Sequence, residues 1–124
     1  MSPEHRPEPV SFMTNEDGDD LIVSFAVDDD PPGEVLSVIL MRTPKFEHLL
    51  EPSERGVRVS HERHRDSEGE YLSRIAFRGT VVQIKSTRRA YSLDVSRVDP
   101  VELKSARRIL KQMNADQAFE LDWG

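Results

Sequence analysis

Three short segments in the second half of the chain alternate apolar and polar residues and follow one another almost without a break. They span residues 71–77, 80–85 and 90–95, and the connections between them have two and four residues. Alternation with a period of two is typical of β-strands. Because parallel strands need a crossover of a dozen or more residues, connections this short predict antiparallel neighbours. We therefore expect a meander-like antiparallel sheet in this half of the chain.

The first half of the chain carries further strand patterns. Residues 21–27 alternate with one strongly apolar face, residues 56–64 alternate again, and residues 10–13 are long enough for a short strand. Residues 34–42 are apolar on both faces, which is typical of a central strand that is covered on both sides. Residues 46–50 are expected to form one helical turn or a loop that packs back. Together these patterns predict an antiparallel sheet of about six strands.

One helix near the C-terminus is marked clearly. Asp99, Pro100 and Glu102 supply an N-cap acid, a proline at the first helical position and an acid near the positive end of the helix dipole. Apolar residues 119, 121 and 123 then alternate and are expected to add a last strand or to dock onto the core. The predicted fold is α+β, with one C-terminal amphipathic helix packed on one face of the sheet. The apolar stripe of this helix consists of Leu103, Ala106, Ile109, Leu110 and Met113.

The length and the N-terminal sequence indicate how the chain is organised. It has 124 residues, which fits one core, and three prolines within the first nine positions. We expect a disordered tail over residues 1–9 and a single domain over residues 10–124.

The chain has no cysteine, which excludes disulfides and thiolate chemistry. The N-terminus lacks the apolar stretch of a signal peptide, and the longest mostly apolar run, residues 35–41, is too short to cross a bilayer. The expectation is a soluble, cytoplasmic protein that does not bind a membrane.

The charge is divided unevenly along the chain. Residues 1–54 contain thirteen acidic and three basic residues, a net charge of -10, so residues 55–124 carry +4 within the total of -6. Acidic loops of this kind either stay solvated or meet a basic surface on a partner. The candidate partner-binding residues are Glu16, Asp17, Asp19, Asp20, Asp28, Asp29 and Asp30.

Patterns for catalysis or metal binding are weak. His61 and His64 lie three residues apart in an expected strand and point to opposite faces, so we do not expect them to share a metal ion. The acidic run at residues 28–30 lacks the spacing of a calcium-binding loop. There is no Gly-x-Ser-x-Gly motif and no glycine-rich phosphate loop. We therefore expect no enzyme activity, no metal and no cofactor, and an unmarked active site is the open alternative.

Several basic residues in the second half raise the question of nucleic-acid binding. Aromatic residues are sparse among them, and the net negative charge opposes attraction to phosphate. We therefore expect no nucleic-acid partner. The basic residues concerned are Arg74, Arg78, Lys85, Arg88, Arg89, Arg107 and Arg108.

The order of the strand patterns resembles that of a known family. The run Asp20-Leu-Ile-Val-Ser-Phe-Ala-Val-Asp-Asp-Asp leads into the apolar strand that ends Ile39-Leu-Met-Arg42, and Gly56-Val-Arg-Val, Gly69-Glu-Tyr-Leu-Ser-Arg-Ile and a helix over residues 102–113 follow. Over residues 19–113 the chain thus resembles one of the immunity-protein families of bacterial polymorphic toxin systems. The resemblance implies a small cytosolic α+β protein that binds and blocks a cognate toxin domain.

The sequence as a whole predicts a non-catalytic protein-binding module, most concretely an immunity-like inhibitor of a toxin domain with a basic cleft. We expect it to be a monomer or a homodimer. Two alternatives stay open. One is a small-ligand-binding protein or enzyme with a concave apolar pocket, and the other is a structural protein that associates with itself through exposed strand edges.

Overall fold

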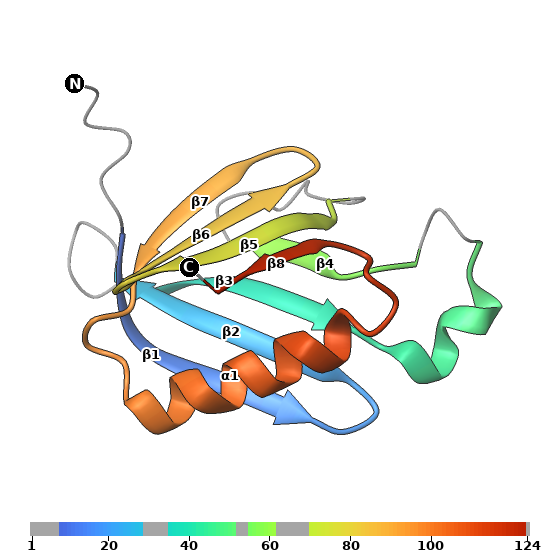
Figure 1. The fold of residues 1–124 in the computed structure, drawn as a ribbon, viewed down its shortest axis with the longest axis horizontal. Helices are drawn as coiled ribbons and strands as arrows, with labels where there is room; N and C mark the ends of the chain where they lie inside the picture. Colours follow the sequence, from blue (N-terminus) through green and yellow to red (C-terminus); the bar gives the residue numbers. More distant parts are fainter. Residues whose placement is uncertain (1–7, 29–34, 52–54, 62–69, 124) are drawn as a thin grey trace.

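The computed structural model describes residues 8–28, 35–51, 55–61 and 70–123 (Figure 1). These residues form one mixed sheet, one α-helix and one 3-10 helix. In chain order the elements are β1 (Glu8–Asp17), β2 (Leu21–Asp28), β3 (Val35–Arg42), the 3-10 helix η2 (Pro44–Leu49), β4 (Arg58–His61), β5 (Leu72–Arg78), β6 (Val81–Ser86), β7 (Ala90–Asp94), α1 (Pro100–Met113) and β8 (Glu120–Asp122).

The sheet has eight strands in the order β4-β3-β2-β1-β7-β6-β5-β8. The predicted α+β class and the antiparallel meander of β5, β6 and β7 are confirmed. The prediction of about six strands, all antiparallel, is wrong in two respects. The sheet has eight strands, and two of its pairs, β1 with β7 and β5 with β8, are parallel. Both parallel pairs join segments far apart along the chain, and the local alternation of residues carries no information about such pairs.

Strand β1 begins earlier than the sequence pattern indicates. Glu8 and Pro9, which the sequence assigns to the tail, pair with Leu93 and Asp94 of β7. A bulge between Val10 and Phe12 follows, and the rest of β1 pairs with β2. One strand thereby links the two halves of the sheet. The remaining tail residues, 1–7, lie outside the described residues.

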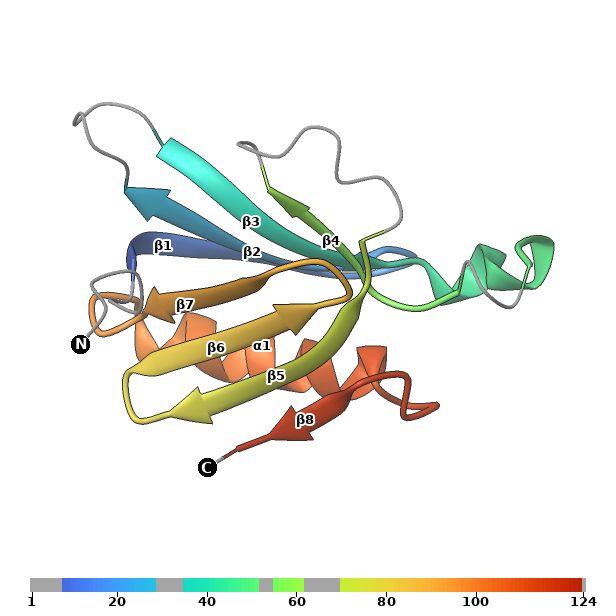
Figure 2. The ribbon, with the colours of Figure 1, turned by 90° about the horizontal axis from the view of Figure 1, so that it is seen from above.

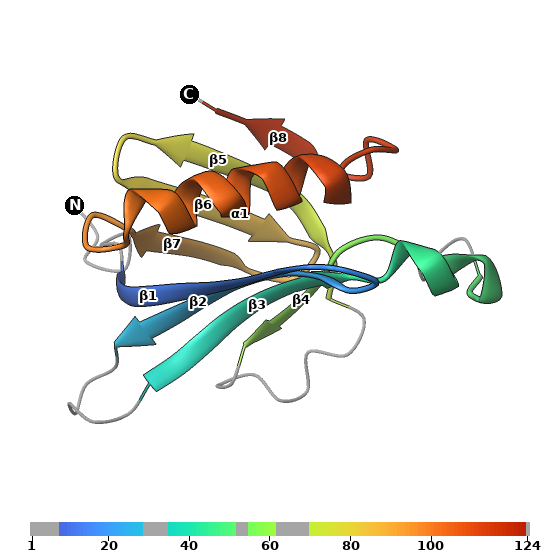
Figure 3. The ribbon, with the colours of Figure 1, turned by 90° about the horizontal axis from the view of Figure 1, so that it is seen from below.

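The sheet curls until its two halves meet at one end. The backbone N–H of Val59 donates to the carbonyl of Glu70 at 3.0 Å, and the N–H of Leu72 donates to the carbonyl of Val57 at 2.8 Å. Figure 2 shows β4 meeting the start of β5 at this end, while β1 pairs with β7 at the other, and Figure 3 shows α1 lying across the sheet. The helix and the inner face of the sheet therefore enclose one core.

Helix α1 forms as the sequence predicts. The Asp99 side chain accepts a hydrogen bond of 2.9 Å from the Val101 N–H, and proline occupies the first turn. The cap and the proline set where the helix starts. The predicted stripe faces inward against strand residues such as Phe25, Leu40 and Ile75. Its buried members are Ala106, Ile109, Leu110 and Met113, and Leu103 is partly buried.

The outer face of β2 and β3 differs from the prediction. Ile22, Ile39 and Met41 alternate with fully or nearly fully buried neighbours and are themselves only partly buried. The expectation that residues 34–42 are covered on both sides is therefore wrong. One helix covers one face of a sheet, and in the described structure the second apolar face of β3 points outward.

Candidate protein-binding surface

A short arm projects from the body of the molecule between β3 and β4. It consists of residues 44–50 and contains η2 (green in Figures 1–3). None of the six residues of η2 is buried, and Phe46 and Leu49 are 50% and 72% exposed. The predicted helical turn is confirmed, but the arm does not pack back onto the core. Large apolar side chains are thus presented to solvent on an ordered element.

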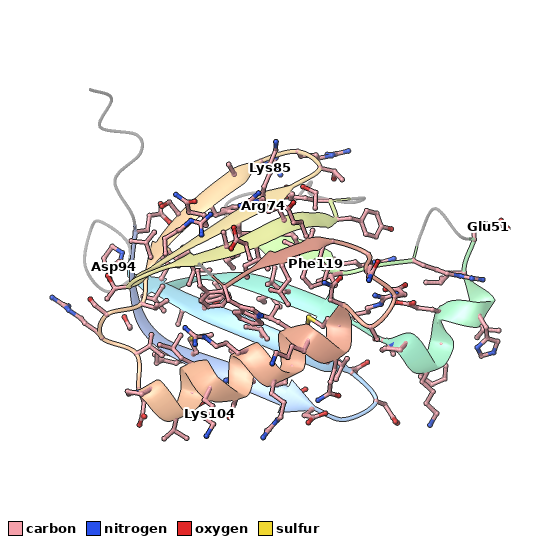
Figure 4. All side chains as sticks on the ribbon, viewed as in Figure 1. Glu51, Arg74, Lys85, Asp94, Lys104 and Phe119 are labelled. Atoms are coloured by element: carbon pink, nitrogen blue, oxygen red, sulfur yellow. The ribbon has the colours of Figure 1, made fainter. Side chains whose placement is uncertain are left out.

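The arm extends an apolar patch on the sheet. Ile22 and Met41 are cross-strand partners on the outer face of β2 and β3, and Ile39 lies diagonally beside them. A groove of about 240 Å³ at the end of β3 is lined by Met41 and by arm residues, among others. Glu51, which is labelled in Figure 4, directly follows the arm in the chain. We define the apolar patch as Ile22, Ile39, Met41, Phe46, Leu49 and Leu50.

A buried arginine holds the arm in place. Arg42, at the end of β3, is 7% exposed, and its five guanidinium N–H donors all find acceptors. It donates to both carboxylate oxygens of Glu47 in the arm at 2.7 and 2.8 Å. It also donates to both oxygens of Asp116 at 2.7 and 2.8 Å and to the Met113 carbonyl at 2.6 Å. The arm is therefore fixed to the C-terminal end of α1.

The charges around Arg42 affect one another. Its hydrogen bonds to Asp116 and Glu47 raise the pKa of the guanidinium further above its usual value. The same bond to Arg42 is the largest cause that lowers the pKa of Asp116. Both groups are thus charged at physiological pH.

Four of the predicted acids lie where β1 leads into β2. Glu16 and Asp17 end β1, Asp19 and Asp20 follow in the turn, and we call the four the acidic turn; all four are exposed. Asp20 accepts a hydrogen bond of 2.7 Å from Thr43, directly before the arm, and the Asp19 carboxylate lies 3.3 Å from the Lys45 ammonium. The acidic turn and the apolar patch therefore form one continuous surface at this end of the molecule.

Asp28 does not join this surface. It ends β2, the strand that Leu21 begins, and seven residue steps of a strand span about 24 Å. Asp28 and the acidic turn are therefore at opposite ends of one strand. Asp29 and Asp30 lie outside the described residues.

A second buried polar cluster surrounds Glu70, which is 1% exposed. One carboxylate oxygen accepts hydrogen bonds from Ser86 at 2.5 Å and Tyr91 at 2.8 Å, and the other accepts from Arg89 at 2.7 Å. Burial, followed by the bond to Glu70, raises the pKa of Tyr91 and keeps the phenol a donor. With both carboxylate oxygens engaged, the cluster ties the start of β5 to the hairpin of β6 and β7.

A hollow of about 370 Å³ lies over β5, β6 and β7. Its lining combines the polar or charged Arg74, Gln83, Lys85 and Ser92 with Ile84, Ala90 and Tyr91. The Arg74 guanidinium is already paired with Glu120 and Asp122 of β8. Among the described residues, no group of three or more His, Cys, Asp or Glu side chains is placed to hold a metal ion.

No protein-family model, no curated protein and no solved structure matches the chain. The class that the described residues define is an α+β protein with one mixed eight-stranded sheet and one main helix. In this part of the chain no helix has the length and apolar character that a membrane span requires.

Proposed function

We propose that this protein is a protein-binding module, most concretely an immunity-type inhibitor that binds and blocks a toxin domain through the arm and the apolar patch. The observation that carries the proposal is the arm itself, an ordered element that exposes Phe46 and Leu49. The strand-order resemblance to an immunity-protein family gives the proposal its concrete form.

The surface has the composition of a protein interface. Interfaces combine an apolar centre with a polar rim, and their strongest anchors are large side chains that enter pockets on the partner. Here the apolar patch is the centre, and the acidic turn supplies charge on one side of the rim. Arg58, which is exposed and lines the groove, adds positive charge to the rim.

The way in which the arm is held also favours binding. A flexible apolar loop loses conformational entropy when it binds, whereas an element already fixed in position loses less. Arg42 fixes the arm through four hydrogen bonds to carboxylates and one to a backbone carbonyl. The arm therefore presents Phe46 and Leu49 in a preformed arrangement.

The test is a double variant, Phe46→Ser with Leu49→Ser, compared with the wild-type protein in affinity capture from the native lysate. Because both side chains are at least half exposed, the variant should keep its unfolding free energy within about 0.5 kcal/mol. We expect it to lose the partner. Val101→Ser is the matched control, since Val101 is 68% exposed in the first turn of α1, outside the arm and the patch.

Two other results of this capture experiment would contradict the proposal. Equal capture of the same protein by the wild type and the double variant would exclude the arm as the binding surface. Capture of the chain itself, together with a doubled molar mass in solution that Phe46→Ser and Leu49→Ser abolish, would assign the surface to a homodimer instead.

A further inference from the structure

The hollow of about 370 Å³ lies over β5, β6 and β7, and the strand register explains its shape. Arg74, Lys85 and Ala90 lie side by side in one row of outward-facing positions, and Gln83 lies beside Ser92 in the next row. The side chains from β5 and β6 are long, whereas Ala90 and Ser92 on β7 are short. The surface is therefore hollowed where the short side chains lie. Figure 4 labels Arg74 and Lys85 on this half of the sheet.

The two cations of the hollow differ in how their charge is balanced. The Arg74 guanidinium is paired with Glu120 and Asp122, which largely neutralise it. Lys85 is exposed and, in the part of the chain that the structure describes, forms no ion pair. None of the described residues that line the hollow is acidic. Lys85 therefore supplies an uncompensated positive charge on a concave surface, which attracts anions.

The hairpin that carries the hollow is held in place from within. The Tyr91 hydroxyl donates to the buried carboxylate of Glu70 at 2.8 Å, and Ser86 and Arg89, beside the turn between β6 and β7, donate to the same carboxylate. A ligand therefore does not have to order this hairpin when it binds. Preformed concave surfaces with a few converging polar groups are typical of small-molecule sites, and the volume of this hollow lies near the lower end of their range.

We propose that this hollow binds a small organic anion, whose carboxylate or phosphate group lies against Lys85 and whose uncharged part lies over Ala90 and Tyr91. Gln83 and Ser92 add an amide and a hydroxyl, which form hydrogen bonds to further polar groups of such a ligand. The hollow shares no lining residue with the arm or the apolar patch. The proposal therefore goes beyond the protein-binding function and does not depend on it.

The test is a titration of the isotope-labelled full chain with small anions, followed through the amide chemical shifts. The probes are glycerol 3-phosphate, glucose 6-phosphate, citrate and benzoate, with glycerol and glucose as uncharged counterparts. We expect at least one anion to shift the resonances of residues 83–85 and 90–92 in a saturable way, with a dissociation constant of about 1 mM or lower. Glycerol and glucose should not shift them. The response to phosphates or to carboxylates identifies the anionic group, and added salt should weaken binding because Lys85 is exposed.

Variants with matched controls locate the site. Lys85→Gln should weaken binding of the anion about tenfold or more, whereas Lys85→Arg, which keeps the charge, should stay within about threefold of the wild type. Ala90→Phe fills the hollow without a change of charge and should also abolish binding; because Ala90 is exposed on a strand, the fold should tolerate it. Lys104→Gln removes a positive charge at an exposed position of α1 and should bind the anion like the wild type.

Three results would overturn the proposal. The first is the absence of saturable shifts at residues 83–85 and 90–92 with every anion. The second is equal weakening by Lys85→Gln and Lys104→Gln, which would show that only the net charge of the protein acts. The third is equal binding of glucose and glucose 6-phosphate, which would show that the hollow does not select an anion. Partner capture through the arm should be unchanged in Lys85→Gln, so the failure of either proposal leaves the other in place.

Discussion

Replacing Arg42 with methionine tests how the arm is held. Methionine fills a similar volume but has no donors, so the change removes five hydrogen bonds at once. The carboxylate of Glu47, whose side chain is 14% exposed, then loses its guanidinium while it is still largely shielded from water. Asp116, whose side chain is 59% exposed, can hydrate instead. The main cost is therefore the unpaired charge of Glu47.

The magnitude follows from this difference in exposure. Removing one partner of a buried ion pair costs about 3–5 kcal/mol, whereas an exposed pair is worth at most about 1 kcal/mol. Since only one of the two carboxylates that Arg42 binds is largely shielded from water, we expect Arg42→Met to lower the unfolding free energy by about 3 kcal/mol, the low end of the range. The fluorescence of Trp123, the single tryptophan, reports urea unfolding, because its ring centre lies 5.1 Å from that of the buried Phe77 in a tilted contact.

A second variant identifies the cause. Arg42→Met with Glu47→Leu removes the buried charge as well, and apolar replacement of a buried ion pair is often neutral. We expect it to recover at least about 2 kcal/mol relative to Arg42→Met, yet to bind the partner more weakly than the wild type, since nothing then fixes the arm. A loss below about 1 kcal/mol in Arg42→Met, or a double variant less stable than the single one, would refute the reasoning.

Two further predictions concern Asp116 and Glu70. Arg42 lowers the pKa of Asp116, so this contact stabilises the fold above the unfolded-state pKa of about 3.9 and is lost as pH falls through the lower folded value. Urea midpoints measured from pH 6 to pH 2 should therefore fall more steeply for the wild type than for Asp116→Asn, and identical slopes would contradict this. Glu70→Gln should lower the unfolding free energy by about 2 kcal/mol, because the amide NH2 faces donors where a carboxylate oxygen accepted. A loss of less than about 1 kcal/mol in urea would show that the cluster can rearrange.

The elements that the sequence predicts well are those with a local cause. Helix α1 starts at its acidic cap and its proline and buries the stripe that its spacing indicates. Strands β5, β6 and β7 pair as their short connections require. The two parallel pairs depend instead on contacts between distant segments. The alternation of residues 119, 121 and 123 is compatible with a last strand, but it carries no signal that the partner of this strand is β5.

Which of the acidic residues lie together could be predicted in part, again from the local strand pattern. The sequence places a strand between the turn acids and Asp28, and an extended strand separates what it connects. The predicted strand between the turn acids and Asp28 therefore already indicates that they do not share one surface. The turn acids do lie together, and what brings the arm to them is the contact between Thr43 and Asp20 and the ion pair between Lys45 and Asp19.

The apolar patch could have been predicted from the sequence by counting the layers of the expected fold. Residues 34–42 are apolar on both faces, and the whole chain predicts one helix. A single helix covers one face of a sheet, so within the described residues no second layer covers the other apolar face of this strand. Exposed apolar area of this kind marks interaction sites. Met41 on that face and Phe46 just beyond it form the surface on which the proposed function depends. A strand with more apolar faces than its fold can bury is therefore itself an indication of a binding surface.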